Sequence, residues 1–181
     1  FGGNIYMDEL MGLKFSISSK SFLQVNSIQT EKLYQHALKL ANIKKDEIWL
    51  DAFCGIGTIT LVASSSAKHV YGIEVVKDAI KMANINKSIN QISNVTFEVG
   101  KAEKLIKNFK NLDGVIVDPP RAGLDSKFID SILESKPKTF IYISCNPQTL
   151  ARDLKRLTEV YIIEKVQPID MFPQTLHVET V

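Results

Sequence analysis

The chain has 181 residues, of which 45% are apolar and 23% are charged, and its formal net charge is +2. This length and composition are typical of one globular domain with a sizeable core, and the near-neutral charge neither favours nor excludes a nucleic-acid partner. Two cysteines without metal-like spacing give neither a disulfide framework nor a zinc site, so we expect no metal. No apolar run approaches the roughly 18 residues of a membrane span and no signal peptide is visible, so we expect a cytoplasmic protein.

Strand-like and helical segments alternate along most of the chain. A short strand and a loop are expected over residues 13–26, before an amphipathic helix over residues 27–41 that places Leu33, Ala37 and Ala41 on one face. Five apolar, β-prone runs follow at residues 47–53, 69–74, 94–99, 113–118 and 138–144. Amphipathic stretches lie between some of these runs, at residues 76–90 and 125–136. The alternation predicts a mostly parallel, doubly wound α/β sheet with crossover helices.

The end of the chain departs from this alternation. The strand-like segments "VYIIEKVQPI" and "LHVETV" are separated only by "DMFPQT". No helix fits between them, so we expect an antiparallel hairpin at the edge of the sheet. We interpret residues 1–181 as a single domain, with residues 1–45 as a lead-in strand, loop and helix and residues 46–181 as the doubly wound core.

A glycine-containing turn, "DAFCGIGTIT" at residues 51–60, follows the first core strand, where ligands of such sheets bind. Gly55 and Gly57 allow a tight turn and a close approach of a ligand, although a plain turn is the alternative. Thr60 stands where a dinucleotide fingerprint has its third glycine, which disfavours a nicotinamide cofactor. Glu74 ends the next strand, where a carboxylate accepts hydrogen bonds from ribose hydroxyls unless it is merely solvated. Together these residues favour a nucleoside cofactor without pyrophosphate, and S-adenosylmethionine is the natural candidate.

The segment "DPPRAGL" at residues 118–124 follows the fourth core strand. Its paired prolines fix the backbone, so the loop is suited to orienting Asp118 and Arg121, although a stiff turn with a surface ion pair is the alternative. Amino-group methyltransferases often carry an aromatic residue after the paired prolines. Arg121 at that position disfavours methylation of an exocyclic amine.

Cys145 stands between an apolar strand and a predicted helix. Asn146 is a good helix cap and Pro147 suits the first helical position, so Cys145 should lie just ahead of a helix N-terminus. The partial positive charge there lowers a thiol pKa and favours the thiolate. The alternative is a small buried side chain without chemistry, which is the usual role of a free cysteine.

Five segments in register resemble the RNA 5-methyluridine (uracil-C5) methyltransferase family: "FLQVN", "DAFCGIGT", "DPPRAGL", "SCNPQTLARDL" and "DMFPQTLHVE". The resemblance covers nearly the whole chain. It implies a Rossmann-like, class I methyltransferase fold, S-adenosylmethionine as cofactor, and methyl transfer to C5 of a uridine in RNA. It also implies that Gln24, Phe53, Glu74 and Asp118 line the cofactor site beside the glycine turn. Lys101 stands where many relatives have an acidic or amide side chain that contacts the adenine, and Glu103 is the candidate to make that contact instead.

The same resemblance makes Cys145 the nucleophile and Glu179 the base. Uracil C5 is a poor nucleophile, but a thiolate that adds to C6 turns the ring into an enolate with negative charge on C5 and O4. After methylation a base must remove the C5 proton so that the thiolate can leave. Arg121 and Arg152 are candidates for contacts with phosphate or uracil oxygens, whereas no reaction step needs Cys54.

Because the chain begins with Phe1 rather than Met, we expect it to be part of a longer protein, a monomer whose N-terminal RNA-binding domains are absent here. Family members also carry such domains, some with an iron–sulfur cluster. We favour 23S ribosomal RNA over tRNA as the substrate. Two alternatives remain, namely a methyltransferase acting on an amine or another base, and a non-catalytic module that binds S-adenosylmethionine or RNA.

Overall fold

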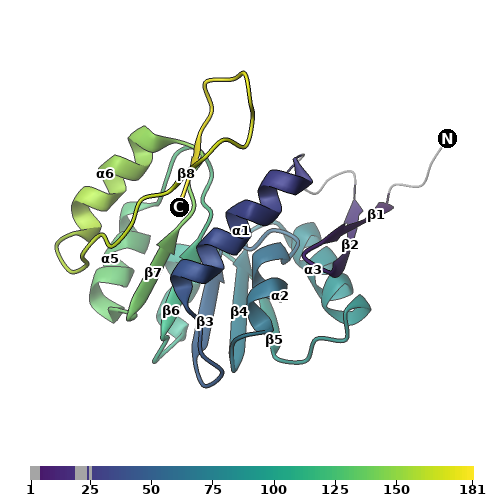
Figure 1. The fold of residues 1–181 in the computed structure, drawn as a ribbon. Helices are drawn as coiled ribbons and strands as arrows, with labels where there is room; N and C mark the ends of the chain where they lie inside the picture. Colours follow the sequence, from purple (N-terminus) through teal and green to yellow (C-terminus); the bar gives the residue numbers. More distant parts are fainter. Residues whose placement is uncertain (1–4, 19–23, 25) are drawn as a thin grey trace.

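A five-stranded parallel sheet forms the centre of the molecule (Figure 1). The structure is a computed structural model that describes residues 5–18, 24 and 26–181. In spatial order the strands are β5 (Val95–Val99), β4 (His69–Glu74), β3 (Ile48–Ala52), β6 (Gly114–Val117) and β7 (Thr139–Tyr142). The winding reverses at β3, which pairs with both β4 and β6. In open α/β sheets, ligands bind at such a reversal, beyond the carboxyl ends of the strands.

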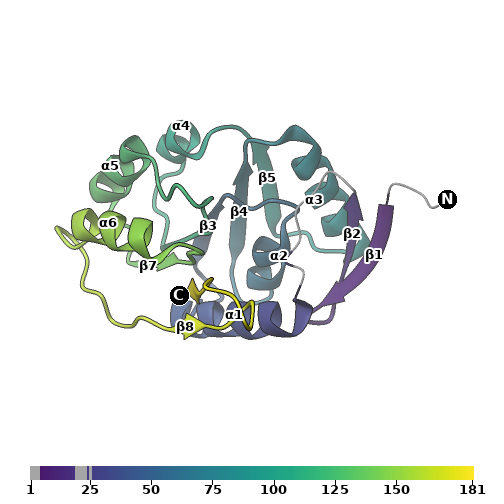
Figure 2. The same cartoon turned by 90° about the horizontal axis from the view of Figure 1, so that it is seen from above.

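Helices cover both faces of this sheet, which confirms the doubly wound prediction (Figure 2). They are α1 (Ser27–Ala41), α2 (Thr58–Ser64), α3 (Lys77–Ile89), α4 (Ala102–Leu105), α5 (Ser126–Ser135) and α6 (Pro147–Leu157), and a 3₁₀ turn, η1 (Ile106–Asn108), follows α4. Along β3, Trp49 packs into the core under α1, α2 and α3, whereas Leu50 packs into the core under α4, α5 and α6. This alternation follows from the two-residue period of a strand. Among the described residues, none of the helices has both the length and the apolar character needed to cross a membrane.

Asparagine side chains cap the first and last helices, and the cap of the last one was predicted. Asn26 accepts a hydrogen bond from the Gln29 backbone N–H at 3.2 Å ahead of α1. Asn146 accepts one from the Gln148 backbone N–H at 3.0 Å ahead of α6, whose first residue is Pro147. The predicted apolar face of α1 is confirmed, since its residues Leu33, Ala37 and Ala41 are all buried.

A separate antiparallel hairpin precedes the core, formed by β1 (Ile5–Leu10) and β2 (Leu13–Ser18). The strand within residues 13–26 was predicted, but β1 was not, because its residues are mostly exposed and show no alternation. The hairpin is attached to α3 by side-chain amides. Asn86 accepts from the Ser16 backbone N–H at 2.7 Å, and Asn90 accepts from the Lys14 backbone N–H at 2.9 Å.

The predicted C-terminal hairpin is present but short. It consists of β8 (Pro168–Ile169) and β9 (Glu179–Thr180), which pair antiparallel. The predicted strand is wrong for residues 160–166, which pair with no other strand and in which Ile162 is 89% exposed. Gln167 does pair with Val181, through backbone hydrogen bonds of 2.7 and 2.9 Å. Two backbone hydrogen bonds of 2.9 Å between Thr180 in β9 and Ser144, two residues beyond the end of β7, join this hairpin to the edge of the central sheet.

Gly57 provides a test of how tightly the turn after β3 is packed. Its φ is 87°, and a Cβ there would lie 2.6 Å from Cζ of Phe97. Gly12 has a similar φ of 77° but open space around it. We therefore expect Gly57→Ala to lower the free energy of unfolding by roughly 2–5 kcal/mol, the sum of left-handed strain and overpacking. Gly12→Ala should cost only about 1–2 kcal/mol. Urea unfolding of both variants checks this, and equal losses would contradict it.

Candidate active site

The turn after β3 is fixed to the end of β4. The backbone N–H groups of Phe53 and Cys54 both donate to the Ile73 carbonyl at 2.9 Å. Phe53 has a φ of 87°, which is unusual for a side chain of this size, and its ring lies edge-on to Phe128 with 5.8 Å between centroids. Gly55 has a φ of 55°, and the space where its Cβ would lie is open. The turn therefore presents backbone to a ligand at the position where the winding of the sheet reverses.

Glu74 extends from β4 toward this turn. Its Oε2 accepts from the Gly55 backbone N–H at 3.3 Å, and its Oε1 accepts from the Val76 backbone N–H at 2.8 Å. The structure thus brings together Glu74, Gly55 and Gly57, as the sequence predicted. The Gly100 backbone N–H donates to the Glu74 carbonyl at 2.9 Å, so the loop that begins α4 also reaches this strand end. In that loop the Lys101 ammonium lies 3.9 Å from the Glu103 carboxylate.

Buried polar groups that the sequence analysis did not identify lie beneath the turn. Asp51 is 1% exposed, and its Oδ2 accepts from the Thr60 hydroxyl at 2.6 Å. The other oxygen, Oδ1, is buried without a hydrogen-bond partner. The Tyr34 hydroxyl on α1 lies 3.2 Å from the Thr58 hydroxyl at the start of α2. A charged residue inside an apolar strand was the visible signal for Asp51, whereas nothing local distinguished Tyr34.

Asp118, in the loop after β6, joins this group. Burial, with smaller contributions from Glu179 and Asp51, raises the pKa of Asp118 to about 8. Burial also raises the pKa of Asp51 to about 7, against the opposing hydrogen bond from Thr60. The pKa of Tyr34 is raised as well, by burial first and then by Asp118. Three elements far apart in sequence thus place acidic groups at the same edge of the sheet.

Cys145 and Glu179 are the neighbours of the two residues that form a short bridge near the end of the chain. Ser144 pairs with Thr180 in an antiparallel bridge, and the neighbouring Cys145 and Glu179 are close enough for the Glu179 carboxylate to act electrostatically on the thiol. Glu179 is 4% exposed, and its Oε2 has no hydrogen-bond partner. Burial raises the pKa of Glu179, and Arg121 partly opposes this shift. A half-exposed thiol and a buried, unpaired carboxylate are therefore adjacent.

The predicted position of Cys145 ahead of a helix is confirmed, but the predicted direction of its pKa shift is wrong. Burial raises the pKa of the thiol, and the carboxylates of Glu179 and Asp118 raise it further. Arg121 lowers it by a smaller amount. Burial and these two carboxylates raise the pKa in place of the lowering expected from the helix end, and sequence alone could not show this because both the burial and the charges come from other segments.

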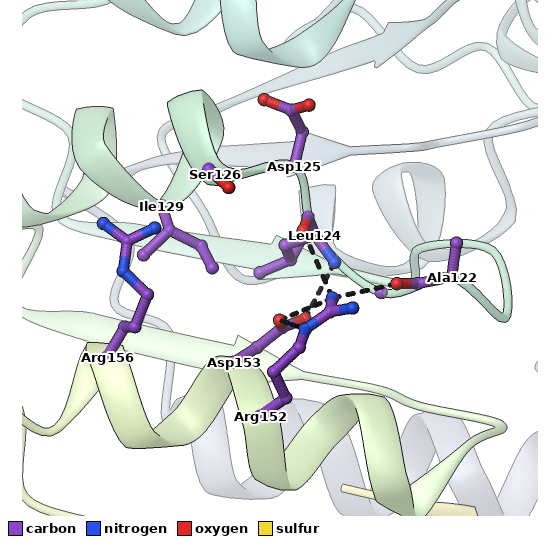
Figure 3. A pocket seen from close by; sticks show the side chains of 9 residues that line it. Ala122, Leu124, Asp125, Ser126, Ile129, Arg152, Asp153 and Arg156 are labelled. Carbon is purple, nitrogen blue, oxygen red and sulfur yellow. Dashed lines mark hydrogen bonds and ion pairs between the residues drawn. The ribbon is translucent and has the colours of Figure 1, made fainter.

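The loop after β6 is fastened to α6 (Figure 3). Buried Asp153 accepts from the Leu124 backbone N–H and the Tyr142 hydroxyl, both at 2.8 Å, and forms an ion pair with Arg152 at 2.7 Å. Arg152 in turn donates to the Ala122 carbonyl at 2.9 Å. These contacts border an open cavity of about 460 Å³ between the loop and α6. Arg152, which the sequence analysis considered for RNA contacts, instead braces the loop that carries Arg121.

Arg121 itself is exposed, and its carbonyl accepts from the Asn146 side-chain amide and the Thr149 hydroxyl, both at 3.2 Å. Gln24 lies beside a small recess lined by Leu10, Phe15 and Thr30. Of the "FLQVN" segment, only Gln24 and Asn26 are among the described residues.

This arrangement suits a particular kind of ligand. A strand-end carboxylate and an open glycine turn fit a nucleoside, and buried carboxylate oxygens without partners fit a ligand that carries positive charge. The fold and the site thus define a Rossmann-like domain of the methyltransferase type, with a cysteine and a carboxylate beside the cofactor position.

Comparisons with known proteins agree with this class. Residues 9–181 match the sequence pattern of the family described as tRNA (uracil-5-)-methyltransferase. The chain therefore belongs to the tRNA (uracil-5-)-methyltransferase family. It is 49% identical over 186 residues to an uncharacterized RNA methyltransferase of Listeria monocytogenes, covering 100% of this chain and 41% of that protein. It is 51% identical over 185 residues to one of Staphylococcus aureus, again covering 100% of this chain and 41% of that protein.

Solved structures give the same result for the fold. The crystal structure of Pyrococcus abyssi tRNA (uracil-54, C5)-methyltransferase, in complex with S-adenosyl-L-homocysteine, superposes with a TM-score of 0.88 at 35% identity. The match covers 99% of this chain and 44% of that one. A precorrin-6y C5,15-methyltransferase from Geobacter metallireducens shares the fold alone, with a TM-score of 0.73 at 14% identity over 92% of this chain and 93% of that one. The chain thus spans less than half the length of the relatives that share its family.

Proposed function

We propose that this domain transfers a methyl group from S-adenosylmethionine to C5 of a uridine in RNA, through a covalent bond between Cys145 and C6 of the base. The observation that supports this most is the proximity of Cys145 to Glu179, whose Oε2 is buried without a hydrogen-bond partner, next to the reversal point of the sheet. Family membership and the S-adenosyl-L-homocysteine complex of the Pyrococcus abyssi enzyme support the choice of cofactor and base.

Five residues around the reversal point would hold the cofactor: Phe53, Gly55, Gly57, Glu74 and Asp118. When bound, S-adenosylmethionine supplies a methyl group on a positively charged sulfur. Glu74 would accept hydrogen bonds from the ribose hydroxyls, and the turn would let the nucleoside lie against its backbone. We propose Gln24 as a further contact, approaching from the segment ahead of α1.

Cys145 and Glu179 would carry out the chemistry on the base. The Cys145 thiolate adds to C6, and the resulting enolate makes C5 nucleophilic. After methylation Glu179 takes the C5 proton, for which its raised pKa makes it a better acceptor than an ordinary carboxylate. Arg121 interacts electrostatically with both residues, so its guanidinium can offset the negative charge on the enolate. Since C5 and C6 are hidden in a stacked helix, the uridine must be extruded or taken from a loop.

The RNA itself is the finer part of this proposal. We retain 23S ribosomal RNA as the first candidate and tRNA as the second, acted on in the cytoplasm by a monomer whose remaining domains help to position the RNA. Mapping 5-methyluridine in both RNA classes, from cells with and without the gene, tests the function. Loss of one 5-methyluridine on deletion is expected, and its return with the intact gene but not with a Cys145→Ala gene completes the test. An unchanged 5-methyluridine map would contradict the proposal.

Glu74 gives a direct test of the cofactor site. Replacing it with alanine removes the acceptor for the ribose hydroxyls and for Gly55, so we expect Glu74→Ala to weaken S-adenosylmethionine binding by roughly 1–3 kcal/mol. Isothermal titration calorimetry measures this. Asp130→Ala, which removes a carboxylate from an ion pair with Arg156 on the helical surface, should leave the affinity unchanged. An unaltered affinity in Glu74→Ala would remove this residue from the site.

A further inference from the structure

Four carboxyl groups converge on the reversal point of the sheet. Asp51 is the next-to-last residue of β3 and Glu74 is the last residue of β4. Asp118 follows β6, and Glu179 lies in β9. Their charges interact in a chain. Glu74 raises the pKa of Asp51, and both Asp51 and Glu179 raise the pKa of Asp118. We call these four residues the acidic quartet.

The quartet has little positive charge to balance it. Arg121 acts on Glu179, but it is exposed on the loop after β6. Two oxygens of the quartet, Asp51 Oδ1 and Glu179 Oε2, are buried without hydrogen-bond partners. Both residues are more than nine-tenths buried. Burying such groups is unfavourable unless a hydrogen bond or an opposite charge compensates them, so the arrangement is suited to receiving a cation.

The two forms of the proposed cofactor differ in charge. S-adenosylmethionine has a sulfonium, an ammonium and a carboxylate, and is a net cation. After the methyl group has left, S-adenosylhomocysteine has a neutral thioether and no net charge. We propose that the acidic quartet makes this site select its cofactor by charge, so that it binds the cationic methyl donor, S-adenosylmethionine, more tightly than the neutral product, S-adenosylhomocysteine. This inference rests on the proposed function and adds a specificity determinant, Asp51, to it.

Protonation links this selection to pH. The raised pKa values of Asp51, about 7, and Asp118, about 8, mean that both carboxyls hold protons in slightly acidic solution. A cation binds poorly to neutral carboxyls and well to ionised ones, so its binding should release protons. The other groups that face the quartet are Tyr34 from α1, Cys54 in the turn and Cys145 after β7. All three have raised pKa values, so they stay neutral over the same range and do not supply the compensating charge.

The test compares the two ligands in calorimetric titrations of the 181-residue chain between pH 6 and pH 8.5. By Coulomb's law at intermediate dielectric constants, one charge pair several ångströms apart changes an equilibrium constant by about tenfold or more. We therefore expect S-adenosylmethionine to bind at least about tenfold more tightly than S-adenosylhomocysteine at pH 8.5. The ratio should fall toward one at pH 6. Titrations in buffers of different ionisation enthalpy should show more proton release with S-adenosylmethionine.

Asp51→Asn is the variant that isolates the charge. The amide oxygen can still accept from Thr60, while the negative charge is lost. The affinity ratio at pH 8.5 should drop by about three- to tenfold, and the pH dependence should flatten. Asp113→Asn is the matched control, because this carboxylate caps Ile48 at the opposite end of the sheet, with 3.0 Å between oxygen and nitrogen. It should leave the ratio and its pH dependence unchanged.

Thermal unfolding gives a readout that needs no titration of ligand. A carboxyl whose pKa is raised by folding stabilises the fold at low pH and loses that contribution as the pH rises through its folded pKa. Without ligand, stability should therefore decline as the pH rises from the ordinary carboxyl pKa of about 4 and should level off above about 7 to 8, the values for Asp51 and Asp118. S-adenosylmethionine should restore more of it at pH 8.5 than S-adenosylhomocysteine does at matched concentration.

The possible outcomes separate this inference from the function on which it rests. Binding of both ligands with equal affinity at every pH would overturn the charge selection and leave the proposed function intact. A folded Asp51→Asn with the affinity ratio of the wild type would overturn the role of Asp51. If neither ligand bound, the proposed function would fail and the inference with it. Should Asp51→Asn fail to fold, the pH profile of the wild type still decides the question.

Discussion

Cys145→Ala should abolish RNA methylation while leaving cofactor binding in place. Without the thiol no bond to C6 can form, and C5 stays too weak a nucleophile to accept a methyl group. We expect the methylation rate to fall by at least about 10⁴-fold, the order seen when a covalent nucleophile is removed from an enzyme. Transfer of radiolabelled methyl groups to RNA from cells lacking the gene measures this, and calorimetry with S-adenosylmethionine confirms that the cofactor site is intact.

Cys54→Ala is the matched control for this experiment. Cys54 is buried in the turn, and burial raises its pKa well above the ordinary value, so it is unsuited to act as a thiolate. Its replacement should retain methylation, apart from a modest loss of stability. Turnover by Cys145→Ala would overturn the mechanism. Loss of activity in Cys54→Ala together with a covalent link at Cys54 would show that Cys54, and not Cys145, is the nucleophile.

Glu179→Gln should fail in a different way, by stalling after methyl transfer. Cys145 can still attack and C5 can still be methylated, but an amide cannot take the C5 proton. Elimination of the thiolate is then blocked, so a protein–RNA adduct that resists denaturant should accumulate in the presence of S-adenosylmethionine. Turnover should fall by roughly 10²–10⁴-fold, the usual contribution of a general base. Denaturing gels detect the adduct, and mass spectrometry should locate the link on Cys145.

Two comparisons sharpen this result. The wild type should form the same kind of adduct with RNA that contains 5-fluorouridine, because fluorine replaces the proton that the base removes. Glu164→Gln, which changes an exposed carboxylate on the segment leading to β8, should turn over normally and form no adduct. Normal turnover by Glu179→Gln would transfer the role of base to another group, and absence of the adduct would place Glu179 in an earlier step.

Tertiary contacts determine the role of Arg152, which stabilises the loop that carries Arg121. The sequence suggested that Arg152 could meet RNA, but its guanidinium bonds to Asp153 and to the Ala122 carbonyl. The side chain of an arginine in a helix can reach solvent, substrate or a neighbouring loop with equal ease. Which of these it meets depends on where the loop after β6 lies, and that position is set by packing of distant segments.

The order and type of the core elements could be predicted from the sequence, because they depend on local patterns. Apolar runs, the cap at Asn146 and the glycines at positions 55 and 57 act within a few residues, so the parallel sheet, the start of α6 and the turn after β3 were expected and are present. Glu74 and Gly55 meet because one strand and one turn end at the same edge of that sheet. The strand β1 was missed because its pairing with β2, not its own pattern, makes it a strand.

The electrostatics of the site could not be predicted, because they arise between segments that only the fold brings together. The position of Cys145 ahead of a helix predicts a lowered thiol pKa, yet burial raises it, and Glu179, 34 positions later, and Asp118, 27 positions earlier, raise it further. Tyr34 and Asp51 join the site through contacts with Thr58 and Thr60 on α2. Coulomb interactions and desolvation depend on distance in space and on burial, and neither is encoded in a short stretch of sequence. The sequence by itself thus determined which residues could take part, and the tertiary structure decided which charges they face.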